Sequence, residues 1–233
     1  MPDIITFEEK RMPEKVFVSW SSGKDSALML HELRKDANYE VAGLLTTVTE
    51  DYGRISMHGV RIKLLEQQAR ALDLPLEKVL ISKTSDNDAY QKAMGSTLKR
   101  LQGAGINTVA IGDIFLEDLR QYREKKLAEI GMRAVFPLWG RKTTDLAGQF
   151  VAEGFGAVVT CVDTQVLDAR FCGRDYDKQF LADLPESVDP CGENGEFHSF
   201  AWRGPIFRQP VQIHKGEIVL REERFCFCDL IPE

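Results

Sequence analysis

The sequence predicts an α/β fold, with a parallel sheet covered by helices on both faces and a smaller C-terminal α+β region. Three observations lead to this prediction. Short runs rich in Val and Ile alternate with longer stretches of helical periodicity. Most of the apolar runs are continuous rather than alternating with polar residues, as expected for strands buried on both faces. The alternation stops near residue 165, where short runs broken by Gly and Pro follow.

Each element is assigned from its local pattern. The expected strands are Lys15–Trp20, Val41–Val48, Val79–Ile81, Thr108–Ile111, Ala134–Phe136 and Ala157–Val162, the last of which closes the parallel series. The expected helices have apolar residues three or four positions apart, and they are Asp25–Ala37, His58–Leu72, Tyr90–Leu101, Leu116–Ile130 and Asp145–Glu153. Ligands in such folds bind beyond the carboxyl ends of the strands.

The chain is expected to divide into three regions. Residues 1–14 form a polar lead-in, residues 15–165 the α/β domain, and residues 166–233 a region that completes the site. In the last region Val211–His214 and Glu217–Leu220, joined by Lys215 and Gly216, are interpreted as a hairpin. An exposed hairpin edge would allow two copies of the chain to pair as a homodimer.

Composition excludes several classes of protein. The 233 residues contain 30 Lys and Arg against 36 Asp and Glu, which gives a net charge of −6 and argues against a nucleic-acid partner. No apolar run approaches the roughly 18 residues that span a bilayer, so no membrane is expected. Five cysteines are too few for a disulfide framework, which predicts a cytoplasmic protein with reduced thiols that serve packing.

The loop after the first expected strand is the most informative segment. It joins a strand to a helix, where backbone N–H groups and the helix N-terminus attract an anion. Three hydroxyls, an ammonium group, a carboxylate and a glycine occupy it. The expected phosphate-binding residues are Ser21, Ser22, Gly23, Lys24, Asp25 and Ser26. It is not a Walker A loop, because Asp follows the lysine. The alternative is a polar turn with an ordinary helix cap.

Residues 21–26 resemble the PP-loop (SGGKDS type) of the adenine nucleotide α-hydrolase superfamily, which has a Rossmann-like fold. The resemblance implies an enzyme that binds ATP with Mg²⁺ and cleaves it between the α and β phosphates. Ser22 stands where the pattern more often has Gly. Residues 21–26 are called the PP-loop below.

Two further segments narrow the resemblance. Gly112–Ile114, followed by Tyr122–Glu124 and Pro137–Trp139, is similar to the middle of the diphthine–ammonia ligases, which take part in diphthamide synthesis. Asp189–Ser199 resembles the C-terminal signature of the same family. The likeness runs from about residue 15 to residue 225.

The C-terminal signature carries three titratable groups between and after two glycines. Gly192 and Gly195 favour tight turns, and two carboxylates and an imidazole close to them suit acid–base work or Mg²⁺ binding. From spacing alone an exposed acidic turn is an equally good interpretation, and the resemblance favours a site. The catalytic candidates are therefore Lys24, Glu193, Glu196 and His198.

The remaining candidates lie at other strand ends. Asp113 follows an apolar strand, where it is able to bind a metal or ribose or to cap the next helix. For His58 the alternative is a segment that only caps a helix. The resemblance implies that Thr46, Thr47, His58, Gly112 and Asp113 bind the nucleotide and that Asp25 and Asp113 bind Mg²⁺.

The resemblance implies an ATP-dependent amide ligase. A substrate carboxylate is adenylated, pyrophosphate leaves, and ammonia displaces AMP. In the family the acceptor is diphthine, a modified histidine on translation elongation factor 2. The alternative acceptor is a different small carboxylate. The alternatives are a PP-loop enzyme that modifies tRNA, which the acidic balance disfavours, and a sensor that binds ATP or AMP without catalysis.

Overall fold

The computed structural model describes residues 12–55 and 59–233, and within them it contains two sheets. The strands of the larger sheet are β1 (Glu14–Ser19), β2 (Tyr39–Thr49), β3 (Arg54–Ile55), β4 (Leu76–Ile81), β5 (Thr108–Ala110) and β6 (Arg133–Val135). β2 pairs in parallel with β1 on one side and β4 on the other, and β5 and β6 continue the parallel series beyond β1. The short β3 pairs antiparallel with the end of β2.

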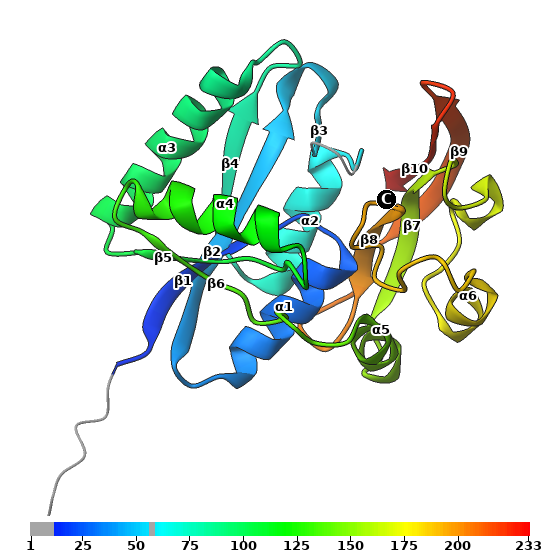
Figure 1. Cartoon of the computed structure of the whole chain (residues 1–233), viewed down its shortest axis with the longest axis horizontal. Coiled ribbons are helices and arrows are strands. Elements are labelled where there is room, and N and C mark those ends of the chain that lie inside the picture. The colour runs from blue at the N-terminus through cyan, green and yellow to red at the C-terminus, as the bar shows by residue number, and fades with distance from the viewer. Residues whose placement is uncertain (1–11, 56–58) are drawn as a thin grey trace, which may run out of the picture.

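Helices cover both faces of this sheet, as the sequence predicts (Figure 1). The helices of this half are α1 (Lys24–Lys35), α2 (Ile62–Leu72), α3 (Asn87–Gly103) and α4 (Glu117–Ala128). Neighbouring strand residues point to opposite faces. Val16 and Val18 of β1 therefore pack in one core with α1 and α2, whereas Phe17 packs in another with α3 and α4.

The strand order places a crevice between β1 and β5. From β1 the chain builds outward through β2 and β4, and it then returns to build β5 and β6 on the other side. Loops that leave neighbouring strands in opposite directions open a crevice at this switch point, where open α/β sheets bind ligands. The PP-loop follows β1, and Gly112 and Asp113 follow β5, so the structure brings these two segments to the same edge of the sheet.

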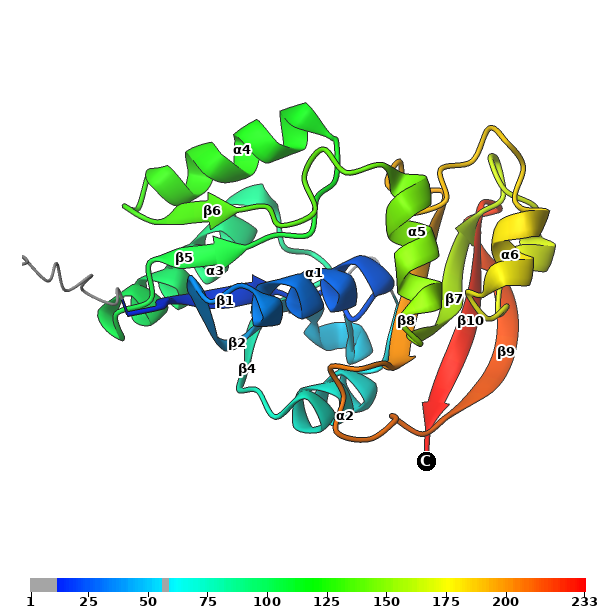
Figure 2. The same cartoon turned by 90° about the horizontal axis from the view of Figure 1, so that it is seen from below.

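The smaller sheet is antiparallel and has the order β8-β7-β10-β9. Its strands are β7 (Gly156–Asp163), β8 (Phe197–Arg203), β9 (Ile213–Arg221) and β10 (Phe225–Pro232). The helices of this half are α5 (Thr143–Ala152) and α6 (Lys178–Asp183), with a 3₁₀ turn, η2 (Ala169–Phe171). Another 3₁₀ turn, η1 (Glu50–Tyr52), follows β2 in the other half. Figure 2 shows α5 between the two sheets, and its Phe150 packs in one core with residues of both.

Two element assignments from the sequence are wrong. The strand expected over Ala157–Val162 does not close the parallel series, because β7 pairs antiparallel with β8 and β10. The expected hairpin turn at Lys215 and Gly216 is absent, because both residues lie inside the continuous strand β9. The reversal comes later, at Glu222 and Glu223, which have φ angles of 52°. The division of the chain near residue 165 stays a prediction, although β7 lies in the C-terminal sheet.

Among the described residues, no helix combines the length and the apolar character needed to cross a bilayer.

Candidate active site

The PP-loop is held in shape by its own hydroxyls. Ser21 Oγ lies 3.3 Å from Ser26 Oγ and accepts a hydrogen bond of 3.3 Å from the backbone N–H of Gly23. Ser26 Oγ donates to the carbonyl oxygen of Gly23 at 2.9 Å. Gly23 caps α1 and has no side chain, so the N-cap residue itself supplies no oxygen to the positive end of the helix. The arrangement fits an anion site.

Ser22 has a backbone that favours glycine. Its φ angle is 68°, in the left-handed region where a side chain costs about 1–2 kcal/mol. Its hydroxyl is buried and has no hydrogen-bond partner among the described residues. Serine at this position therefore carries both an unfavourable backbone conformation and an unsatisfied polar atom. A ligand oxygen bound at the loop would explain both features.

A glutamine that the sequence analysis missed fixes the carbonyl group of Ser22. The side chain of Gln68, on α2, is fully buried. Its amide donates to the carbonyl oxygens of Ser22 at 3.0 Å and Ala201 at 2.6 Å, and its Oε1 accepts from Trp20 Nε1 at 2.9 Å. The N–H of Ala201, on β8, also donates to the Ser22 carbonyl at 2.9 Å. A polar residue on the apolar face predicted for this helix is the signal that could have identified Gln68.

The side chain of Lys24 joins its own loop to the C-terminal half. Its side chain is 4% exposed, and Nζ donates to both oxygens of Asp25, at 2.9 and 2.7 Å, and to the carbonyl oxygen of Cys191. The rings of Tyr176 and Phe197 lie 5.7 and 5.3 Å from Nζ. Burial lowers the pKa of Lys24, but Asp25 and other negative charges outweigh it and the pKa is raised. Lys24 is therefore a buried cation between the two halves.

A second bond joins the start of α1 to the C-terminal half. The backbone N–H of Lys24 donates to Ser199 Oγ, on β8, at 3.2 Å. Together with the bonds from Ala201 to Ser22 and from Lys24 to Cys191, this contact makes the C-terminal half part of the PP-loop structure. Ser199 is a site residue that the sequence analysis did not single out, although it ends the signature segment.

The signature segment Asp189–Ser199 folds around Glu196. The Glu196 carboxylate is buried and accepts bonds from the backbone N–H groups of Asp189 at 3.1 Å and Asn194 at 3.0 Å, and from the Asn194 amide. Gly192 has a φ angle of 67°, and a Cβ there would lie 2.8 Å from the carbonyl oxygen of Phe197, so only glycine fits. In this structure Glu196 shapes the turn that presents its neighbours.

Glu193 reaches across to the loop after β5. Its Oε1 accepts a bond of 2.7 Å from the backbone N–H of Ile114, the residue after Asp113. Burial raises the pKa of Glu193 to about 7; Asp25 and Asp113 add to this rise, whereas the Ile114 bond and Lys24 oppose it. A carboxylate with such a pKa suits proton transfer near neutral pH.

Asp113 is a second buried carboxylate beside the PP-loop. Its Oδ1 pairs with Arg123 Nη1 at 3.0 Å, whereas Oδ2 is buried without a hydrogen-bond partner among the described residues. Burial raises the pKa of Asp113, and Arg123 opposes the rise. A Cβ at Gly112 would lie 3.6 Å from the backbone of Asp25, so this segment packs directly against the start of α1. Glu124 faces away and pairs with Arg120 at 2.9 Å.

His198 lies on β8 between Phe197 and Ser199. Burial lowers its pKa to about 4, and the nearby charge of Lys24 lowers it further in the same direction. His198 is therefore a neutral imidazole at physiological pH, able to donate or accept a hydrogen bond but not to act as an acid.

A cleft of about 670 Å³ opens beside the PP-loop, between α3, α4 and the ends of the strands. Ser21, Thr46 and Thr47 line it, with apolar walls that include Ile81 and Ile111. Thr46 Oγ1 donates to the carbonyl oxygen of Trp20 at 2.7 Å, so its hydroxyl fixes the loop. An apolar cleft beside an anion-binding loop has the shape that a nucleotide needs. His58 lies outside the described residues.

These residues fit ATP and a divalent cation. The buried hydroxyl of Ser22 and the buried oxygen of Asp113 both lack partners among the described residues, and carboxylate oxygens are the ligands that Mg²⁺ prefers. Both oxygens of Asp25 accept from Lys24 Nζ, so Asp113 Oδ2 is the open carboxylate oxygen beside the PP-loop.

The cysteines show no activated thiol. All five are free and buried. Burial raises the pKa of Cys191 to about 12, and its thiol lies 3.4 Å from the carbonyl oxygen of Thr143. A thiol with a raised pKa is a poor nucleophile, which agrees with a packing role.

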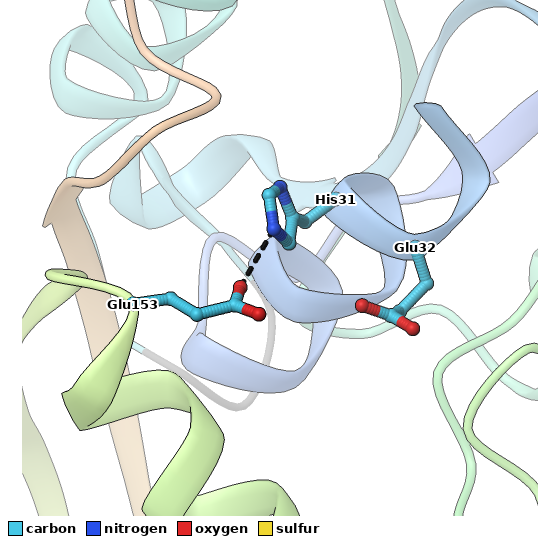
Figure 3. A group of neighbouring side chains, drawn as sticks. All are labelled: His31, Glu32 and Glu153. Atoms are coloured by element: carbon cyan, nitrogen blue, oxygen red, sulfur yellow. Dashed lines mark ion pairs between the residues drawn. The ribbon is translucent and has the colours of Figure 1, made fainter. Parts of the chain in front are cut away.

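A second group of titratable side chains lies outside the site, where α1 meets α5. His31, Glu32 and Glu153 could together hold a metal ion, and His31 Nε2 lies 2.6 Å from Glu153 Oε2 (Figure 3). Lys35 Nζ lies 3.3 Å from both carboxylates, and the Gln149 amide donates to both at 3.0 Å. Lys35 and Gln149 thus hold one oxygen of each carboxylate, and the group is an ion-pair network between the two halves in which Glu153 Oε2 lies against His31.

Known proteins resemble both halves of the chain. A family model described as the diphthamide synthase N-terminal domain matches residues 14–134, and one described as the diphthamide synthase C-terminal domain matches residues 142–230. Proteins named diphthine–ammonia ligase are similar to the chain. The one from Bos taurus is 23% identical over 170 residues, which cover 66% of this chain and 64% of the relative.

Two further relatives carry the same name. The human protein is 23% identical over 171 residues, covering 67% of this chain and 64% of the relative. The protein from Schizosaccharomyces pombe is 24% identical over 224 residues, covering 88% of this chain and 37% of the relative. The matched chain thus spans 64% of the length of the bovine and human proteins. Since the two family models together extend over most of its length, the chain belongs to the diphthamide synthase family.

Proposed function

We propose that the protein is an ATP-dependent ligase that joins ammonia to a carboxylate, with diphthine as the acceptor. The names of its relatives support the substrate pair. The observation that carries the proposal is the bond from Lys24, in the PP-loop, to the carbonyl oxygen of Cys191, two residues before Glu193 in the signature segment. A phosphate site and an acid–base site adjoin there, as a reaction between ATP and a second substrate requires.

The PP-loop binds the phosphates of ATP through the start of α1 and the hydroxyl of Ser22. The acceptor carboxylate attacks the α-phosphorus, the bond to the β-phosphate oxygen breaks, and pyrophosphate leaves. Lys24, a buried cation, offsets negative charge that develops in this step. Mg²⁺ held by Asp25 and Asp113 would neutralise phosphate charge.

Glu193 serves the second step. Ammonia attacks the activated carbonyl carbon, AMP leaves, and one proton must be removed from the attacking nitrogen. The raised pKa of Glu193 makes its carboxylate a base of suitable strength, and its bond to Ile114 fixes one of its oxygens. Glu196 and His198 act as positioning groups, one by shaping the turn and the other as a neutral imidazole on β8.

The experiment is an assay of products with ATP, Mg²⁺, an ammonium salt and a diphthine-bearing protein. We expect AMP, pyrophosphate and amide in equal amounts. Formation of ADP and orthophosphate would refute adenylation. E193Q is expected to lower amide formation at least about 10²-fold while ATP still binds. E124Q, which alters a partly exposed carboxylate on α4 whose partner among the described residues is Arg120, is the matched control and should keep full activity.

A further inference from the structure

The second sheet has one open edge. Its order, β8-β7-β10-β9, leaves β8 and β9 as the outer strands. The outer side of β8 contacts the PP-loop, where the N–H of Ala201 donates to Ser22. β9 lies on the side of the sheet away from the larger sheet (Figure 1 and Figure 2). Open edge strands present unpaired backbone groups that another strand is able to use.

The C-terminal half of β9 exposes an apolar run at this edge. Ile218, Val219 and Leu220 are consecutive, and they are 56%, 40% and 58% exposed. Proteins commonly protect an edge with a charge, a proline or a bulge, and the register of β9 against β10 shifts between Lys215 and Ile218, on the N-terminal side of this run. Here Glu217 and Arg221 flank the apolar run, and neither makes an ion pair within the described part of the chain.

We infer that β9 pairs antiparallel with β9 of a second copy of this chain, about a two-fold axis at Val219. In this register Val219 lies opposite its own counterpart, and Ile218 lies opposite Leu220. Glu217 then lies opposite Arg221, once on each side of the axis. Because successive side chains alternate between faces, one face carries the two Glu–Arg pairs around Val219 and the other carries four apolar side chains. The two four-stranded sheets become one.

Charge selects this register over its neighbours. An axis at Ile218 places Lys215 opposite Arg221, and an axis at Glu217 places two glutamates opposite each other; both arrangements are repulsive. An axis at Gly216 pairs Lys215 with Glu217, but its centre has no side chain and Lys215 already pairs with Asp175 at 2.8 Å. The axis at Val219 combines opposite charges with apolar contacts.

The first test is the mass of the protein in solution, measured by light scattering over a wide range of concentration. The parent chain is expected to rise from 26.3 kDa to twice that mass. E217R and R221E each place like charges together at both ends of the interface and should weaken the dimer at least about tenfold. The double variant E217R/R221E exchanges the charges and should restore it. Circular dichroism checks that each variant is folded.

The second test is a cross-link at the axis. All five native cysteines are buried, so an added surface thiol reports its own surroundings. V219C should form a disulfide-linked dimer under mild oxidation. L80C, at a residue of β4 that is 46% exposed, should not.

Three results would overturn the inference: a constant mass of 26.3 kDa, a dimer that the charge exchange fails to restore, and a dimer in which V219C does not cross-link. Ligase activity per chain should be unchanged in E217R, because the interface lies apart from the PP-loop. The interface therefore stands or falls independently of the proposed function.

Discussion

The side-chain amide of Gln68 donates to the carbonyl oxygen of Ser22 at a distance of 3.0 Å. Ser22 is the loop residue with a left-handed backbone, and Gln68 belongs to a helix 46 positions further along the chain. Because Gln68 also bonds Ala201 and Trp20, one buried side chain joins the PP-loop, the residue that follows β1, and β8. The loop conformation therefore depends on tertiary contacts as well as on its own sequence.

Replacement of Gln68 by leucine tests this dependence. Q68L keeps the volume but leaves the buried Trp20 N–H and Ala201 carbonyl without this partner, so the free energy of unfolding should fall by about 2–4 kcal/mol. ATP affinity should fall as well. Denaturant titration and ATP binding measure the two effects. Q67L is the control, since within the described part of the chain Gln67 makes a single hydrogen bond, of 3.3 Å, to Glu233. An equal loss in Q67L would contradict the assignment.

Glycine at Ser22 should stabilise the ligand-free protein. S22G removes a left-handed side chain and an unsatisfied hydroxyl, and these gains exceed the greater freedom of glycine in the unfolded chain, giving a net gain of about 1 kcal/mol. S22A keeps the backbone cost and separates the two contributions. If the hydroxyl binds phosphate, both variants bind ATP more weakly than the parent. Thermal unfolding with and without ATP measures these effects, and a less stable S22G would contradict the backbone argument.

Glu193 should make the metal-free protein less stable as pH rises. Its folded pKa of about 7 exceeds the usual value of 4.5, so the folded state holds this proton more tightly than the unfolded chain does. The stability that this proton confers is therefore complete below pH 4.5 and is lost as pH rises to about 7. E193Q should lack this loss. Denaturant titrations at pH 5 and 8 compare the two proteins, and identical losses would contradict the assignment.

His198 should make the protein less stable as pH falls. Its folded pKa of about 4 lies below the usual 6.5, so the unfolded chain takes up the proton first as pH falls between these values. This proton uptake lowers the free energy of unfolding by up to about 3 kcal/mol. H198Q should retain more of its neutral-pH stability at pH 4.5 than the parent does. An equal acid loss in both proteins, by the same titration, would show that His198 is not buried as a neutral group.

Asp113 should control the requirement for Mg²⁺. D113N removes a charge from a buried oxygen without a partner among the described residues, so folding stability should be kept or slightly increased. The Mg²⁺ concentration for half-maximal pyrophosphate release should rise at least about tenfold. D118N alters an exposed carboxylate in the first turn of α4 and should leave it unchanged. An unchanged Mg²⁺ requirement in D113N would remove Asp113 from the proposed metal ligands.

Much of the larger sheet could be predicted because its signals are local. Continuous apolar runs and helical periodicity placed β1, β2, β4 and the helices between them within a few residues. The expectation that Asp113 lies near the PP-loop followed from the rule for parallel sheets, and the structure brings Gly112 against Asp25.

The rest depends on contacts between distant residues. An apolar strand such as β7 looks the same in a parallel and an antiparallel sheet, so only its partners decide. Glycine at 216 suggested a turn, but pairing with β10 keeps β9 continuous. The direction of the Lys24 side chain could not be predicted from the sequence either, because its partner, the carbonyl oxygen of Cys191, is 167 residues away.

The hydrogen bonds from Ala201 to Ser22 and from Lys24 to Ser199 have a consequence for how this protein is able to diverge. An N-terminal half expressed alone, or fused to an unrelated partner, would carry the PP-loop residues without the strand that holds two of its backbone groups. Such a fragment would keep the motif yet present a differently shaped loop. Shuffling of the nucleotide-binding half into new proteins is thereby constrained, and the two halves are expected to be inherited together.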